Sequence, residues 1–259
     1  MISATPTHTP TEPGSPAAAS RCAVRAESRG ARTVLEELRS DPPVALRPLP
    51  SHGRLARVAI VQSSATLLAG DDVSTHVRVG PGARLELVEI SATLCHPGPA
   101  ERPILQRIEI DVRPGGLLML DEQPLIVSAG SHLRRTTRIR LHGDGRCLHR
   151  EALVLGREGE RPGAASVRTR VERDGTPILD EAIDTTQLAV LRSPAVLGKA
   201  RYVSSAGLWG AAPGELPARA LALGPGDTVL RGLGVGAIDG QPVIDSIWPR
   251  WREALLQDR

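Results

Sequence analysis

Three glutamates stand at the same distance from a glycine that can turn the chain. In each case the glutamate follows the glycine by six residues, in the pairs Gly116 and Glu122, Gly145 and Glu151, and Gly175 and Glu181. If the units that contain them stack, their carboxylates could line up along one edge. Because like charges repel one another, such a row indicates a cation in transit or a basic partner.

Glu151 precedes an apolar run, residues 152–155 (ALVL), that is typical of a protein core. A buried carboxylate must be paired with a cation or must coordinate one. The sequence leaves both explanations open: an arginine such as Arg138 or Arg157, or a bound ion.

Two short segments combine cysteine with histidine, donors that suit nickel, copper or zinc. Cys95 and His96 are adjacent in the chain. Neighbouring side chains of a strand point to opposite faces, so these two cannot easily chelate one ion. Cys147 and His149 share a face and form the better pair. Two ligands do not close a metal site, and the usual zinc spacings are absent, so a purely structural role for this pair stays open.

No motif for phosphate binding or nucleophilic catalysis accompanies these residues. Segment 232–236 (GLGVG) lacks the Lys-Ser/Thr of a phosphate loop and the spacing of a dinucleotide fingerprint. No G-x-S-x-G motif is present. The sequence therefore gives no support to a hydrolase or a nucleotide-binding enzyme.

Four repeated units between Val73 and Ile183 must position the glutamates. Each unit has a strand of alternating apolar and polar residues, a glycine turn and a mostly apolar strand, a pattern typical of a β-hairpin. Successive turns are 29 to 34 residues apart. This period indicates hairpins stacked in a layered or superhelical β-arrangement. An ordinary antiparallel sandwich is the alternative, and the fold class is mainly β in either case.

The flanking segments complete the predicted organisation. Residues 1–20 are rich in Pro, Thr, Ser and Ala without apolar periodicity, which is typical of a disordered tail. Residues 21–259 then form a single β-rich domain. Small residues between 193 and 214 predict a loop-rich stretch, and residues 247–257 predict an amphipathic helix. We therefore expect one or two helices near the C-terminus.

The composition argues against several kinds of partner and location. The 259 residues include no Phe, one Tyr and three Trp, too few aromatic side chains for base stacking on nucleic acid. The net charge of +3 is spread without a basic run. No apolar stretch approaches the roughly 18 residues that cross a bilayer, so we expect no membrane binding. Three dispersed cysteines and the lack of a secretory signal favour a reducing cytoplasm.

Several segments, in their order and spacing, resemble the urease accessory protein UreD, also called UreH. The likeness covers about residues 21–210 and extends more loosely to the terminal helix. It rests on VQSSATLLAGDD (61–72), VGPGARLEL (79–87), DEQPLIVSAGSHLRRTTRIRL (121–141), EALVLGREGE (151–160) and RDGTPILDEA (173–182).

The resemblance implies a non-enzymatic chaperone that binds the urease apoprotein. With the partner proteins UreF and UreG, such a chaperone helps nickel reach the urease active site. The family fold is mainly β and superhelically wound, which favours the layered arrangement of the hairpins. The resemblance also implies an internal polar path on which nickel binds only transiently, so no tightly bound cofactor is expected. A β-scaffold that bridges other proteins and never touches metal is the alternative function.

The resemblance assigns Asp71, Thr93, Glu151 and Glu181 to this nickel path. Asp71 matches the carboxylate of the family's Gly-Gly-Asp motif, and Thr93 keeps the hydroxyl of its Ala-Ser/Thr-Lys motif. Glu151 matches the acidic residue before the apolar run that ends in Gly-Arg. Glu181 matches the acidic residue that closes the family's Asp-Gly-x-Pro segment.

Further metal candidates are Cys147, His149 and Gln123, the last of which matches the glutamine of the family's Pro-Gln-x segment. This chain also departs from the family pattern. Glu122 replaces the proline before that glutamine, Ala69 replaces a glycine, and Leu94, Cys95 and Pro97 replace a Lys, a Tyr and an Arg.

Overall fold

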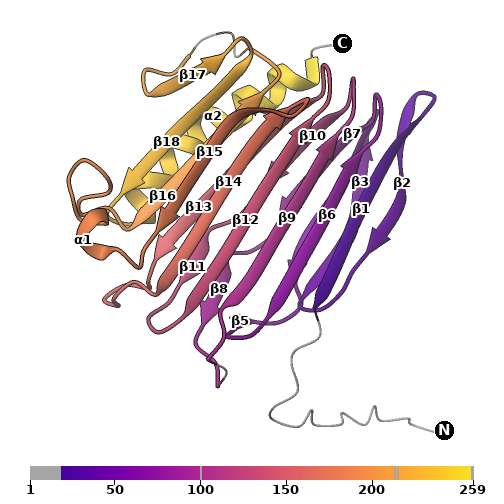
Figure 1. The fold of residues 1–259 in the computed structure, drawn as a ribbon. Coiled ribbons are helices and arrows are strands. Elements are labelled where there is room, and N and C mark those ends of the chain that lie inside the picture. The colour runs from indigo at the N-terminus through magenta and orange to yellow at the C-terminus, as the bar shows by residue number, and fades with distance from the viewer. Residues whose placement is uncertain (1–18, 100, 213, 215, 258–259) are drawn as a thin grey trace, which may run out of the picture.

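The computed structural model describes residues 19–99, 101–212, 214 and 216–257. They form two β-sheets that lie face to face, with one long helix beside the second sheet (Figure 1). Sheet A has the strand order β15-β14-β12-β9-β6-β1-β2. Its strands are β1 (Ser20–Arg29), β2 (Arg32–Arg39), β6 (Asp72–Val79), β9 (Ile104–Val112), β12 (His132–Leu141), β14 (Ala164–Arg173) and β15 (Thr176–Asp184).

Sheet B has the order β17-β18-β16-β13-β10-β7-β4-β3, with three short strands attached at the side. The main strands are β3 (Val44–His52), β4 (Leu55–Gln62), β7 (Arg84–Glu89), β10 (Leu117–Asp121), β13 (Arg146–Leu155), β16 (Tyr202–Trp209), β17 (Ala220–Gly224) and β18 (Asp227–Gly234). The short ones are β5 (Leu67–Leu68), β8 (Thr93–His96) and β11 (Leu125–Val127).

The first three glycine turns connect the two sheets and do not close hairpins. β6, β9 and β12 lie in sheet A, and the strands that follow them, β7, β10 and β13, lie in sheet B. Within each sheet the successive units pair in parallel, as His76 does with Glu109 and Leu118 with Cys147. The layered arrangement is therefore confirmed. The antiparallel sandwich is wrong, and only the fourth unit, β14 with β15, is a true hairpin.

The apolar composition of the second strand in these units explains why it joins sheet B and does not pair with the first strand in sheet A. Leu117, Leu118 and Met119 on β10 are all fully buried. Leu118 packs between the sheets, whereas Leu117 and Met119 pack on the opposite face of sheet B. A strand that is apolar on both faces needs cover on both sides. As a hairpin partner within sheet A it would leave one apolar face in water.

The half of the interior next to the glycine turns is dry. We call it the aliphatic layer. Its members from sheet B are Leu85, Leu87, Leu118, Leu120 and Cys147, and those from sheet A are Val77, Val79, Ile110, Val112, Ile139 and Leu141. Each is at most 3% exposed, so this layer supplies a large share of the hydrophobic stabilisation.

Helix α2 (Ala237–Gln257) covers the outer face of sheet B. Ile244, Ile247, Trp248 and Trp251 bury their side chains against that face. The predicted C-terminal helix is confirmed, but it begins ten residues earlier than expected, since Ala237 precedes residue 247 by that number. Gly240 and Pro242 hide the periodicity of its first half.

Part of the predicted loop-rich stretch is instead strand β16, every residue of which is buried. Its small residues permit close packing. A Cβ atom on Gly232 of the neighbouring β18 would lie 2.4 Å from Ser204 Oγ and 2.6 Å from the carbonyl oxygen of Gly240 on α2. The glycines and serines therefore reflect a helix pressed against the sheet, and not a flexible loop. A second helix, α1 (Leu188–Leu191), precedes β16.

The predicted N-terminal tail falls mostly outside the described residues, because residues 1–18 are not among them. Ser20 already belongs to β1 and is only 4% exposed. Among the described helices, none has the length and apolar character that crossing a membrane requires.

Candidate functional site

The acidic row consists of Glu89, Glu122 and Glu151, which extend the parallel register of β7, β10 and β13. Asp121 pairs with Val88 on one side and with Arg150 on the other, so the next residues of the three strands stand side by side. The predicted alignment therefore holds for Glu122 and Glu151. Glu181 lies on β15 of sheet A, so it is not part of this row.

Glu89 was missed by the sequence analysis because its unit lacks the glycine. Ala83 occupies the position of that glycine, and Glu89 follows it by six residues. The spacing alone, without the glycine, would have found it.

Glu89 is held by neutral donors. It accepts hydrogen bonds from the hydroxyl of Thr93 (2.9 Å) and the backbone N–H of Gln123 (2.9 Å). Gln62 donates to Thr93 Oγ1 at 2.9 Å. Burial, followed by repulsion from Glu122, raises the pKa of Glu89 to about 7.

Glu122 lies at the centre of a buried ion pair. Arg135 of β12 donates to one carboxylate oxygen at 2.5 Å, and His149 Nε2 lies 2.8 Å from the other. Burial opposes ionisation, but Arg135 and then His149 outweigh it and lower the pKa of Glu122 to about 2. Because an ionised carboxylate can only accept, the Nε2 of His149 carries the proton here.

The buried arginine is not one of those expected. Arg138, proposed as a partner of Glu151, lies on the exposed side of β12, and Arg157 pairs with Glu160. Arg135 is on the inward side of β12 together with Leu133 and Ile139, and it is 5% exposed. Its place in the apolar alternation of that strand was visible in the sequence.

Glu151 differs from Glu122 because its direct partners are hydroxyl groups. Thr169 Oγ1 lies 2.9 and 3.2 Å from the two carboxylate oxygens, and Ser205 Oγ lies 3.5 Å from one of them. Among the described residues it makes no ion pair. Arg135 and Arg231 act on it electrostatically without a hydrogen bond. A carboxylate held in this way retains capacity to bind a cation.

Glu181 marks one end of this polar region. It pairs with Arg231 of β18, and the two side chains are 35% and 26% exposed. Burial lowers the pKa of Arg231, and the charge of Glu151 opposes that shift. The partially exposed ion pair therefore lies between Glu151 and solvent.

Metal-ligating atoms of Glu122, His149 and Glu151 all lie within 4.8 Å of one another. Carboxylate and imidazole donors suit divalent first-row metals. A metal ion bound here must displace the proton on His149 Nε2 and compete with Arg135 for Glu122. Such competition favours weak, reversible binding.

Two small cavities flank Glu151. One, of about 20 Å³, is lined by Glu122, Gln123 and Asp245 among others, and the second, of about 30 Å³, by Arg135, Ser205 and Arg231 among others. Each has room for about one water molecule. The polar groups between the two sheets form the polar layer, which adjoins the aliphatic layer. Its members are Glu89, Thr93, Glu122, Arg135, His149, Glu151 and Thr169.

Cys147 lies in the aliphatic layer, two residues from His149 on the same face of β13. Burial strongly raises the pKa of its thiol. A metal ligand must be a thiolate, so the geometry favours His149 with the two glutamates over the predicted pair with Cys147. That pair stays a prediction.

Asp71 lies apart from the cluster, on the turn before β6. One of its carboxylate oxygens accepts the backbone N–H of Leu68 at 2.8 Å. Burial raises the pKa of the Cys95 thiol to about 12, and the charge of Asp71 adds to this while Arg135 opposes it. Asp71 therefore acts electrostatically on Cys95, which lies two residues after Thr93 on β8, and does not contact the acidic row directly.

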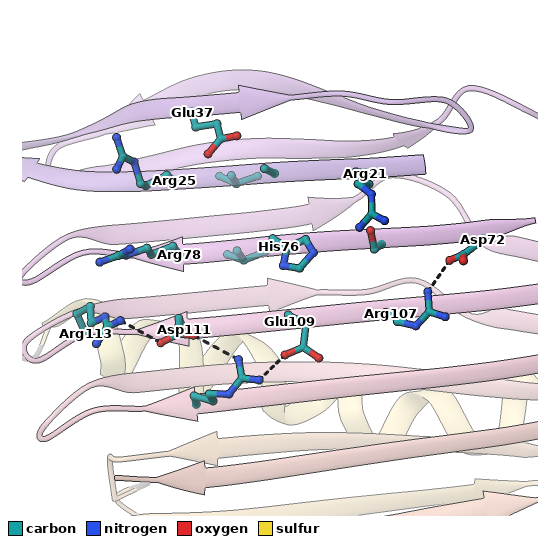
Figure 2. Close-up of a pocket in the computed structure, with 15 residues that line it drawn as sticks. Arg21, Arg25, Glu37, Asp72, His76, Arg78, Arg107, Glu109, Asp111 and Arg113 are labelled. Carbon is teal, nitrogen blue, oxygen red and sulfur yellow. Dashed lines mark hydrogen bonds and ion pairs between the residues drawn. The ribbon is translucent and has the colours of Figure 1, made fainter. Parts of the chain in front are cut away.

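The outer face of sheet A carries a second candidate site, a shallow groove of about 880 Å³. Figure 2 shows arginines and carboxylates from neighbouring strands lying across it. Arg140 donates to Glu109 at 2.6 Å, and Arg107 pairs with Asp72 at 2.5 Å. Much of the charge is thus neutralised within the sheet, as is typical of a solvated polar face.

Comparison with known proteins identifies the family of this chain. The family model for UreD urease accessory protein matches residues 18–259. The chain is similar to urease accessory protein UreD 1 of Streptomyces griseus, with 39% identity over 250 residues and 95% of each chain. It is 38% identical over 179 residues to UreD 2 of Saccharopolyspora erythraea, which covers 69% of this chain and 63% of that one. It is 30% identical over 274 residues to UreD of Frankia casuarinae, with 95% and 86% covered. The chain belongs to the UreD family of urease accessory proteins.

Proposed function

We propose that this chain is a cytoplasmic, non-enzymatic maturation factor that binds the urease apoprotein together with UreF and UreG. In this proposal, residues 21–259 act as one domain, and nickel passes through the polar layer on its way to urease. The similarity of the chain to urease accessory proteins supports the maturation role.

The observation that carries the nickel path is the environment of Glu151. It is half-buried in the polar layer, is held by hydroxyls, and is flanked by two water-sized cavities. Removing a carboxylate from water is costly unless the charge is compensated. A function that requires a cation at this point explains why the charge is kept.

The path would run through Thr93, Glu151 and Glu181, which the resemblance assigns to it, and through the donors that lie beside them. Thr93 holds Glu89, Glu122 and His149 offer donors beside Glu151, and Glu181 lies at the partially exposed end. Asp71 would act near the opposite end. Oxygen donors bind nickel weakly, which suits an ion that must also leave.

Co-expression tests the proposed function. The cognate urease subunits, UreF and UreG are produced in nickel medium with and without this chain, and the nickel content and activity of purified urease are measured. We expect both to be lost when the chain is omitted. Urease with full nickel content and activity in its absence would contradict the maturation role.

The alternative is a scaffold that bridges the partner proteins and never touches nickel. It is favoured by the buried ion pair of Glu122 with Arg135, which satisfies that carboxylate without a metal. Under this alternative, omission of the chain still abolishes urease activation, but substitutions at Glu151 and Glu181 leave activation unchanged.

A further inference from the structure

A pocket of about 560 Å³ lies beside α1, outside the polar layer. Figure 1 shows α1 at the end of the sandwich where β18 ends. The floor of the pocket is apolar and is made by Leu155, Pro162, Leu191, Pro194 and Leu197. Leu155 and Leu191 are only 4% and 7% exposed, so the pocket reaches down to the core.

Backbone hydrogen bonds and one arginine hold the pocket open. The N–H groups of Leu197 and Gly198 donate to the carbonyl oxygen of Leu191 at 3.0 and 3.1 Å. Arg201 donates to the carbonyl oxygen of Leu155 at 2.8 Å and to that of Glu160. The shape is therefore formed before any partner binds, which reduces the entropy cost of binding.

The rim of the pocket is cationic. Arg161, Arg192 and Lys199 line it, and their side chains form no hydrogen bond or ion pair with any described residue. Glu160 is the one carboxylate among the lining residues, and it already pairs with Arg157. The groove on sheet A differs, because Arg107 there pairs with Asp72 (Figure 2) and Arg140 pairs with Glu109.

Two exposed valines adjoin this rim in sequence. Val190 is 53% exposed and Val196 is 43% exposed. The unpaired cations of the rim favour, by charge complementarity, a protein partner that carries carboxylates. The apolar floor selects an apolar side chain, and the rim selects carboxylates around it.

We propose that this pocket docks a segment of a protein partner that inserts an apolar side chain flanked by carboxylates. The inference goes beyond the nickel path and rests on the proposed function only in requiring a protein partner. Leu155 lies four residues beyond Glu151 on β13, a distance of about 13 Å along a strand. The docked segment would therefore lie near one end of the polar layer.

The chemistry of Lys199 makes the proposal directly testable, because it is the only lysine in the chain. Carbodiimide coupling forms an amide between an amine and a carboxylate in contact, and the reagent takes up the water that is lost. The test uses the full chain assembled with its co-expressed partners, the urease apoprotein, UreF and UreG. Mass spectrometry then identifies the peptide joined to Lys199.

We expect Lys199 to couple to an Asp or Glu that has an apolar residue within one helical turn. Lys199→Arg keeps the charge but removes the reactive amine, so the complex should persist while this coupling disappears. Reversing the charge of the rim with Arg192→Glu and Lys199→Glu should raise the Kd for the partner about tenfold. The matched pair Arg134→Glu and Arg138→Glu, on the outer face of sheet A, should change it by less than about twofold.

A complex that forms without coupling at Lys199, and whose Kd is unaffected by reversing the rim, would contradict the pocket and leave the maturation role intact. Absence of any complex on size-exclusion chromatography would contradict the pocket and the proposed function together.

Discussion

The same three strands, β7, β10 and β13, build two interiors of opposite character. In the aliphatic layer their inward positions hold Leu85, Leu118 and Cys147, which need nothing but close packing. Four residues further along, the same positions hold Glu89, Glu122 and Glu151, which need a partner for every charge. Sheet A covers both layers, so the side chains make the difference.

The comparison teaches which layer serves stability and which serves function. Aliphatic residues of similar volume would fit the polar layer and would stabilise the protein at least as well as a buried ion pair does. Residues that break the local pattern at a cost in stability are expected at functional sites. The two layers should therefore respond differently to substitution.

The largest expected effect is the loss of Arg135. Arg135→Met leaves Glu122 buried with only His149 as its partner, and breaking a buried pair costs about 3–5 kcal/mol. Urea denaturation measures the free energy of unfolding. The outward Arg138→Met on the same strand should change it by less than about 0.5 kcal/mol. Removing both charges, with Glu122→Leu added to Arg135→Met, should recover most of the loss. If the Arg135→Met variant were as stable as Arg138→Met, the buried ion pair would not be needed for the stability of the fold.

A packing change in the aliphatic layer should come next. Leu118→Ala opens a cavity in a fully buried site, and such changes cost about 2–5 kcal/mol. Because no charge is involved, the loss should be the same at pH 5 and pH 8. Leu221→Ala, at a residue that is 58% exposed, provides the control in the same denaturation experiment. A loss that varied strongly with pH would show that the two layers are not separate.

Glu89 should make the stability of the polar layer depend on pH. Its pKa is raised from 4.5 to about 7, so the folded protein binds a proton that the unfolded chain releases between these values. The wild-type protein therefore loses stability as pH rises through this window. Glu89→Gln should be more stable than the wild type above pH 7, by about 2–4 kcal/mol, and this gain should shrink to nothing below pH 4.5.

Unfolding free energies at pH 4.5 and pH 8 test this prediction, with Glu101→Gln on an exposed loop as the control for a lost carboxylate. An equal effect of Glu89→Gln at both pH values would contradict it.

The smallest effect concerns the hydroxyl that holds Glu151. Thr169→Val removes the hydrogen bond at 2.9 Å without changing the volume, and should cost about 1–2 kcal/mol. Thr169→Ser keeps the hydroxyl and should lose less. If Val and Ser variants were equally stable in thermal unfolding, the hydroxyl would not support the carboxylate.

Much of the fold could be read from the alternation along the strands. The inward and outward residues of β6, β9, β12 and β14 follow it. The glutamate spacing predicted that Glu122 and Glu151 lie side by side. A hairpin and a turn between two sheets have the same local signature, however, because each needs only a glycine between two extended strands. The choice depends on what covers the second strand, and α2 is far away in the sequence.

The site could be predicted only in part. Glu151 and Thr93, both named from the sequence, lie in the polar layer, whereas Glu89 and Arg135 were overlooked. Glu89 lacks its glycine, and Arg135 is one arginine among several on β12. The alternation along β12 places Arg135 on the inward face, but its pairing with Glu122 depends on the register of sheet A against sheet B, a long-range feature that no local spacing encodes.

The central claim is that nickel passes Glu151 in the polar layer, and the nickel content of urease tests it most directly. Urease is matured with the Glu151→Gln variant, which keeps the shape but removes the charge, and with Glu172→Gln, on the outer face of sheet A, as the control. We expect the nickel content to fall about tenfold or more with Glu151→Gln, at unchanged stability of the variant, and to stay normal with Glu172→Gln. Full nickel loading with Glu151→Gln would contradict the account.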